Sequence, residues 1–142
     1  MKKKKGLILV LVAVFLIIIF AAAVYYFQNR TVYTLEAPQA KGLESVRIKK
    51  NAAEEIILKN NDDMENILKV LGVERTTTKE SKNGIPMIVD NIIVIDFNYS
   101  KDKKATVYVY EEGGKFFIEQ PYNGIYKISK DDYEKIDSYA SK

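Results

Sequence analysis

The chain has 142 residues and a mass of 16.2 kDa, which suits one domain built around one hydrophobic core. It contains no cysteine, no histidine and no tryptophan. This composition excludes disulfides, cysteine nucleophiles, thiolate or imidazole metal ligands, and any mechanism that needs a histidine base. The formal charge of +3 and the pI of about 8.9 indicate, at first sight, a basic protein.

The N-terminus carries a membrane-spanning signal. Four lysines at positions 2–5 precede residues 7–27 (LILVLVAVFLIIIFAAAVYYF), which are all apolar or aromatic. At ~1.5 Å per residue, a helix over this run is roughly 32 Å long and matches a hydrocarbon core of about 30 Å. Because the lysines stand on one side and only Arg30 follows closely on the other, we expect the N-terminus in the cytoplasm. The sequence predicts a single-pass anchor over residues 1–28, with the rest of the chain outside the cytoplasm.

A cleaved signal peptide is the alternative interpretation of the same segment. Residues 7–20 have the length of a signal-peptide apolar region, and residues 21–23 (AAA) supply a small-residue cleavage site. Cleavage near Ala23 would remove about 23 residues and release the rest of the chain as a secreted protein. Against cleavage, the apolar run continues through residues 24–27, and Tyr25 and Tyr26 occupy the place of an interfacial aromatic belt. We favour the uncleaved anchor.

The positive charge belongs to the anchor and not to the rest of the chain. Without the four N-terminal lysines, 18 basic residues face 19 acidic residues, a net charge of −1. A nearly neutral outer part has no electrostatic footprint for DNA or RNA. Nucleic acid is therefore not expected as a partner.

The outer part divides into a short linker and one domain. Residues 29–42 have no sustained periodicity and contain Pro38 and Gly42, which predicts a stalk. The folded extracytoplasmic domain is expected over residues 43–142. Alternation of apolar and polar residues predicts a strand over residues 45–49, and a second short strand is expected over residues 54–59.

One helix is expected next along the chain. Asp62 and Glu65 have the spacing of a capping box, and Gly72 stops the helix. Its apolar stripe has helical spacing and consists of Met64, Ile67, Leu68 and Leu71. Residues 76–78 favour a strand, and Asn83 with Gly84 indicates a turn.

The C-terminal half is dominated by strands. Residues 92–99 predict a buried strand, and residues 105–111 and 115–120 a hairpin around Gly113 and Gly114. A turn at residues 121–124 leads into a strand at 125–128. Ser129 and Asp132 have the spacing of a second capping box, which predicts the start of a helix. Tyr133, Ile136 and Ala140 lie on one face of this helix. The fold class is α+β, with a meandering, mainly antiparallel sheet and two helices beside the transmembrane helix.

The hairpin register separates two faces. A two-residue turn places Tyr110 opposite Phe117 and Tyr108 opposite Glu119 on one face. The other face is core and carries Val107, Val109, Phe116 and Ile118. The first face is either covered by a helix or exposed as an aromatic patch for a glycan or peptide. The candidate partner-binding residues are Tyr108, Tyr110, Phe117, Gln120, Tyr122 and Asn123.

The acidic residues do not form a catalytic pattern. They come in adjacent pairs at positions 54–55, 62–63, 111–112 and 131–132. Neighbours in a strand point to opposite faces, and the two Asp pairs stand where a helix dipole favours them. We predict no catalytic residue. A carboxylate-dependent hydrolase of envelope glycans stays the alternative, since it needs only two carboxyl groups roughly 5–9.5 Å apart across a cleft.

No cofactor and no metal ion is predicted either. Asp96, Asn98, Ser100 and Asp102 copy the alternate spacing of a calcium loop. However, Lys101 replaces its glycine, and Val107 stands where its glutamate should be.

Several stretches together resemble a known family. They are residues 76–87 (TTTKESKNGIPM), 90–99 (DNIIVIDFNY) and 107–129 (VYVYEEGGKFFIEQPYNGIYKIS), of which residues 118–129 are the most specific. They resemble a family of small membrane-anchored extracytoplasmic domains of unknown function, found chiefly in Firmicutes. The resemblance covers about residues 43–139. It implies a location and no activity.

These observations lead to one functional expectation. The protein is expected to be a non-catalytic binding or interaction module of the cell envelope, with an envelope protein or glycan as its partner. An immunity-like or inhibitor-like protein that docks on an envelope enzyme is a variant of the same class.

Overall fold

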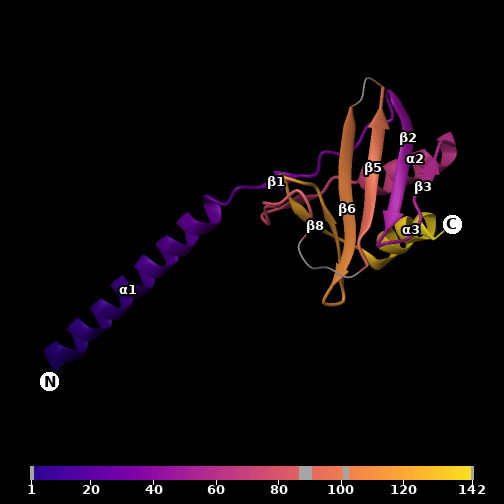
Figure 1. Cartoon of the computed structure of the whole chain (residues 1–142). Coiled ribbons are helices and arrows are strands. Elements are labelled where there is room, and N and C mark those ends of the chain that lie inside the picture. The colour runs from indigo at the N-terminus through magenta and orange to yellow at the C-terminus, as the bar shows by residue number, and fades with distance from the viewer. Residues whose placement is uncertain (1, 87–90, 101–102, 142) are drawn as a thin grey trace. The chain divides into compact units, whose positions relative to one another are not determined.

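The computed structural model describes residues 2–86, 91–100 and 103–141, which fall into two compact units (Figure 1). The first unit ends at Thr31 and the second begins at Val32. Each unit is described by itself.

The first unit is one long helix, α1 (Lys2–Gln28). Its residues 8–28 are long and apolar enough to cross a membrane, which also holds for a signal sequence. At its end the Arg30 guanidinium lies 5.1 Å from the ring centre of Tyr26 and 5.7 Å from that of Phe27. The predicted N-terminal apolar helix is thus confirmed, and its orientation in a membrane stays a prediction.

The second unit contains a six-stranded sheet in which all neighbouring strands are antiparallel. The strand order is β3–β2–β5–β6–β7–β8. In chain order the strands are β2 (Leu43–Lys50), β3 (Ile56–Leu58), β5 (Ile93–Tyr99), β6 (Lys104–Glu112), β7 (Lys115–Glu119) and β8 (Ile125–Ile128). A separate two-stranded sheet pairs β1 (Tyr33–Thr34) with β4 (Thr76–Thr77). The predicted α+β fold is confirmed.

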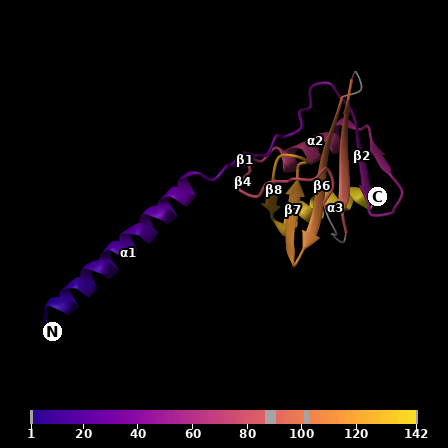
Figure 2. The same ribbon diagram turned by 60° about the vertical axis from the view of Figure 1, so that its left-hand side comes forward.

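Two helices, α2 (Asn61–Leu71) and α3 (Lys130–Ala140), pack on one face of the large sheet (Figure 2). Alternate residues of the central strands meet the apolar stripes of both helices in one core. The fully buried members include Ile48, Ile95, Phe97, Val107, Val109 and Ile118 from the sheet, with Ile67, Leu71 and Ile136 from the helices. The predicted core face of the hairpin is confirmed.

The two helix starts differ in how well they were predicted. The Ser129 hydroxyl accepts the Asp132 N–H at 3.0 Å, so the cap expected for α3 is confirmed. The capping box expected at Asp62 and Glu65 is wrong. Asn60 caps α2, because its backbone is extended and its side-chain oxygen accepts the Asp62 N–H at 2.9 Å.

The segment expected to be a stalk belongs largely to the folded unit, which begins at Val32 and not at residue 43. We call residues 32–39 the strap. Tyr33 and Thr34 pair with β4, and Leu35 is 6% exposed and joins the core, with its N–H donated to the Arg75 carbonyl at 2.9 Å. A strand of two residues is too short to produce a visible alternation, which is why periodicity did not detect it.

Candidate ligand groove

The sheet face opposite the helices is covered by a loop. We call residues 78–86 the cover loop. Its Lys79 carbonyl accepts the Ile125 N–H at 2.9 Å, its Ser81 N–H is donated to the Asn123 carbonyl at 3.2 Å, and Glu80 forms a β-bridge with Gly124. Helices α2 and α3 contribute to the core on the other face, so neither of these two helices covers this one. The loop occupies the place where we expected either a helix or open solvent.

The two tyrosines of the face that we expected to be either covered by a helix or exposed as a patch are buried. Tyr108 is 8% exposed and Tyr110 is 3% exposed, while Phe117 is half-buried. The register that places Tyr110 opposite Phe117 and Tyr108 opposite Glu119 is confirmed. The exposed-patch alternative is wrong at the two tyrosines, and alternation could not decide between the alternatives because it fixes the face of a side chain but not what lies above it.

A buried polar cluster fastens the cover loop to the sheet. The Glu119 side chain, in a residue that is 4% exposed, accepts hydrogen bonds from the Ser81 hydroxyl at 2.6 Å and from the Tyr110 hydroxyl at 3.0 Å. Burial, and then the nearby Glu119 charge, raise the pKa of Tyr110 well above its usual value, so this hydroxyl stays a donor. The Lys79 ammonium lies 5.5 Å from the Phe117 ring centre. These contacts give Tyr110 and Phe117 a structural role.

Gln120 and Asn123 hold the strap. The Gln120 side-chain oxygen accepts the Glu36 N–H at 3.0 Å, and its amide nitrogen donates to the Glu36 carbonyl at 3.0 Å. The Asn123 amide donates to the Thr34 carbonyl at 2.9 Å and to the Gln120 side-chain oxygen at 2.7 Å. Both residues therefore bind a segment of their own chain, a role that sequence reasoning did not anticipate.

Tyr122 has a different position from the other five candidates. Its side chain is 77% exposed, and its backbone has a positive φ of 58°. The Asn123 N–H is donated to the Gln120 carbonyl at 3.0 Å, which closes a turn with Tyr122 at its third residue. That place in a turn favours glycine or asparagine, and a bulky residue is strained there.

Two clefts adjoin this turn and share Ala105 and Gln120. The larger, of about 660 Å³, lies between residues 36–41 and the ends of β5 and β6, and Gln120 lines one side. The smaller, of about 370 Å³, is lined by Gly84, Thr106, Tyr108 and Tyr122, among others. We call the two together the groove. Of the six predicted residues, the structure brings Tyr108, Gln120 and Tyr122 to the groove.

The larger cleft carries basic side chains that sequence reasoning did not single out. They are Lys41, Lys103 and Lys104. The Lys104 ammonium pairs with Asp96 at 2.7 Å, and Asp96 also accepts the Thr106 hydroxyl at 2.7 Å. Lysines in connecting segments usually point into water, so no local pattern in the sequence marks them as neighbours across a cleft.

The acidic pairs take structural positions. Asp62, Asp63, Asp131 and Asp132 lie in the first turns of α2 and α3, where the helix dipole stabilises them. Glu55 pairs with Arg47 at 2.8 Å. Among the described residues that line the two clefts, Glu36 is the one carboxylate, so this described lining does not set two carboxyl groups against each other.

The described part of the chain holds no group of three metal-ligating side chains. Asp96 and Asn98 of the calcium-like spacing lie in β5, whereas Lys101 and Asp102 lie outside the described residues.

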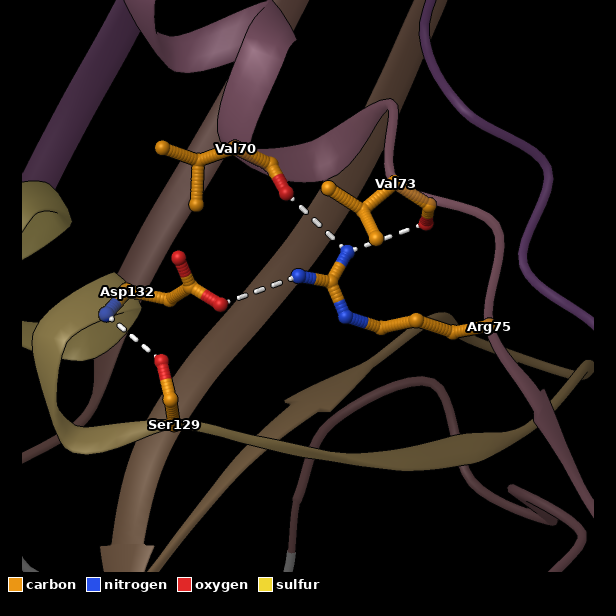
Figure 3. A network of polar contacts seen from close by, with 5 residues as sticks. All are labelled: Val70, Val73, Arg75, Ser129 and Asp132. Carbon is orange, nitrogen blue, oxygen red and sulfur yellow. Dashed lines mark hydrogen bonds and ion pairs between the residues drawn. The ribbon is translucent and has the colours of Figure 1, made fainter.

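An arginine joins the end of α2 to the start of α3 (Figure 3). Arg75 has a side chain that is 10% exposed, and it donates to the Val70 and Val73 carbonyls at 3.0 and 3.1 Å and to Asp132 at 3.2 Å. The end of α2 is thereby tied to the start of α3. Because the Arg75 carbonyl accepts the Leu35 N–H, the same residue also positions the strap.

Comparison with known proteins identifies the family. A family model described as "Domain of unknown function (DUF5300)", with the family name DUF5301, matches residues 31–127, a range that includes the strap. An NMR structure of a protein from Ruminococcus gnavus is 28% identical with a TM-score of 0.56, and the match covers 67% of this chain and 94% of that one. This relative alone supports the expected origin in Firmicutes. No protein of curated function matches the chain. The chain belongs to the DUF5301 family of domains of unknown function.

Proposed function

We propose that this protein is a non-catalytic, membrane-anchored binding module that holds a component of the cell envelope in the groove. Helix α1 acts as a single-pass anchor with its N-terminus in the cytoplasm, and the α+β unit lies outside the cell membrane. The apolar run and the lysines at positions 2–5 support this location. The absence of histidine and cysteine from the sequence supports binding over catalysis.

Tyr122 is the observation that carries the proposal. An aromatic side chain that is 77% exposed gains little from burial, and its left-handed backbone costs about 1 kcal/mol or more that glycine would not incur. The ring lies over Gly84 of the cover loop, where an added Cβ would be 3.0 Å from the Tyr122 hydroxyl oxygen, and most of its surface stays open to solvent. A ring beside a cleft is well suited to contact a sugar ring or a peptide side chain.

Photo-crosslinking in intact cells tests the proposal. A photoreactive phenylalanine analogue replaces Tyr122 in one variant and Ile57, which is 51% exposed on strand β3, in the control. We expect a discrete product from position 122 that is absent from position 57. Mass spectrometry of this product then separates a protein partner, as for an immunity-like protein, from a glycan.

The same variants define the opposing result. Products that are identical at both positions, or no product at position 122 while the protein is folded and membrane-bound, contradict a ligand at the groove.

A further inference from the structure

We propose that the larger cleft of the groove binds a phosphate or carboxylate group, and that Lys41, Lys103 and the Tyr99 hydroxyl are its ligands. This inference rests on the proposed binding function and adds the chemical class of the ligand.

The positive charge of the cleft is a local excess. Residues 29–142 carry a net charge of −1, yet three lysines and one carboxylate, Glu36, line this cleft. Asp96 neutralises Lys104 at 2.7 Å. Within the described ranges, no carboxylate lies within ion-pair distance of Lys41 or Lys103. Among the described residues, Lys41 and Lys103 therefore face one cleft from separate segments with Glu36 as its remaining carboxylate, and a bound anion would offset the local excess of positive charge.

A hydroxyl donor stands between these segments. The Tyr99 oxygen accepts the Gln39 N–H at 3.1 Å, so the direction of that hydrogen bond leaves the tyrosine proton to donate. Burial raises the pKa of Tyr99, and the hydroxyl keeps this proton at neutral pH. Tyr99 also lines a smaller neighbouring cleft with Lys41 and Lys103, which places the three groups around one corner.

The remaining lining suits an anion carried on a carbon skeleton. Ala37, Pro38 and Ala105 give the cleft an apolar wall beside the lysines. Its volume of about 660 Å³ lies within the range of small-molecule sites, far more than a free inorganic ion needs. A phosphodiester or carboxylate on a glycerol or sugar unit matches both the charge and the wall.

Lysine reactivity in the full chain measures occupancy. The protein is placed in nanodiscs of pure phosphatidylcholine and treated with an acetylating reagent, with and without glycerol phosphate, and each lysine is quantified by mass spectrometry. At a ligand concentration of twice the Kd, labelling of Lys41 and Lys103 should fall by about threefold. The exposed Lys115 and Lys127 are internal controls and should keep their labelling rate.

A second arm separates the two sources of the anion. Nanodiscs containing phosphatidylglycerol, without added phosphate, protect the same two lysines if the ligand is a lipid headgroup. Protection by glycerol phosphate in phosphatidylcholine alone assigns a free or polymer-borne phosphate. Protection in neither arm, or equal protection of Lys115 and Lys127, overturns the inference.

A matched pair of double variants links the binding to the cleft. Lys41→Gln with Lys103→Gln removes two charges at the cleft, and Lys115→Gln with Lys127→Gln removes two charges elsewhere. In a titration followed by the amide resonance of Ala105, the first should raise the Kd for glycerol phosphate by about tenfold or more, and the second by less than about twofold. Equal effects overturn the inference. A crosslink from position 122 that persists without any lysine protection rejects the anionic ligand and leaves the binding module in place.

Discussion

The side-chain amide of Gln120 makes both hydrogen bonds that a β-strand would make to Glu36. Its oxygen accepts the Glu36 N–H and its nitrogen donates to the Glu36 carbonyl, each at 3.0 Å, although the two residues are 84 positions apart. A side chain thus extends the sheet edge to an N-terminal segment that has only two paired residues of its own. The strap depends on this amide as much as on β1.

Replacing Gln120 by Glu should loosen the strap. The second carboxylate oxygen would face the Glu36 carbonyl, so one hydrogen bond becomes a repulsion, and the free energy of unfolding should fall by about 1–3 kcal/mol. Urea unfolding followed by tyrosine fluorescence measures the loss, and hydrogen exchange at the Glu36 amide locates it. Gln39→Glu is the control, since it makes the same charge change at an exposed strap residue. Unchanged exchange at Glu36 in Gln120→Glu would show that the amide does not hold the strap.

Arg75→Ala should lower the free energy of unfolding strongly. The substitution leaves two helix-end carbonyls and Asp132 without their partner in a largely buried site, and the expected loss is about 2–4 kcal/mol. Arg47→Ala is the matched control, because its pair with Glu55 is short at 2.8 Å but exposed. It should cost less than about 1 kcal/mol in the same urea titration. Equal losses in the two variants would contradict a stabilising role for the hydrogen bonds of the Arg75 guanidinium.

Ionisation of Tyr126 should lower the free energy of unfolding at alkaline pH. Burial, and then the charge of Glu36, raise the pKa of Tyr126 from 10.0 to about 12. The unfolded chain loses this proton near pH 10 and the folded chain near pH 12. The contribution is thus complete below pH 10 and is lost as the pH rises to 12, at up to about 1.4 kcal/mol per pH unit. In Tyr126→Phe, the decline in unfolding free energy between pH 10 and 12 should be shallower by that amount.

At neutral pH, Tyr126→Phe and Tyr110→Phe should differ in their effect on the free energy of unfolding. The Tyr126 hydroxyl is buried and has no hydrogen-bond partner among the described residues, so Tyr126→Phe should leave the free energy of unfolding within about 1 kcal/mol at pH 7. Tyr110→Phe removes a hydrogen bond to the buried Glu119 and should cost about 1–3 kcal/mol. Urea titrations of both variants at pH 7 measure the contrast. A large loss in Tyr126→Phe would reveal a partner for its hydroxyl.

Tyr122→Gly should separate binding from folding. Glycine relieves the left-handed backbone, so the unfolding free energy should stay within about 1 kcal/mol of the parent or rise. The partner is first identified by crosslinking from position 122. Its co-purification with the Tyr122→Gly variant should then be lost. Asn123→Ala is the comparison, because it removes two hydrogen bonds to the strap and to Gln120 and should destabilise the fold. A strong loss of stability in Tyr122→Gly would assign the tyrosine to the fold.

Helix α1 should keep the full-length chain in the membrane. Cell fractionation with detection of the C-terminus should recover an uncleaved chain with the membranes, and protease added outside the cell should reach residues of the α+β unit. Replacing the lysines at positions 2–5 by glutamine should weaken this orientation. A chain found only in the medium and shortened by about 23 residues would establish cleavage in its place.

The sequence predicted the parts of the fold whose signal is local. The Gly113 and Gly114 turn fixed the hairpin register, both glycines have positive φ, and Ser129 capped α3 as expected. The parts it missed depend on contacts between distant segments. Neither the strap bonded to Gln120 nor the cover loop bonded to Glu119 leaves a periodic pattern, because each is fixed by single polar side chains from another part of the chain.

At the groove, three of the six candidate residues line a cleft, while others contact the protein's own chain. Gln120, Tyr122 and Asn123 of the turn at residues 121–124 and its flank were predicted to contact a partner. In the structure, Asn123 and Gln120 face inward to the strap, and Tyr122 alone of this turn is highly exposed. The lysines of the larger cleft could not be found from spacing, since Lys41 and Lys103 are brought together only by the fold.

The strap also sets the mechanics of the protein. Tension carried along the chain from α1 arrives at Tyr33 first, then at Thr34, Leu35 and Glu36, whose contacts are with β4, Asn123, Arg75 and Gln120 in turn. Contacts loaded one after another yield at a lower force than contacts loaded together. The strap would therefore peel stepwise under a pull, while the six-stranded sheet, which begins only at Leu43, keeps its strands paired.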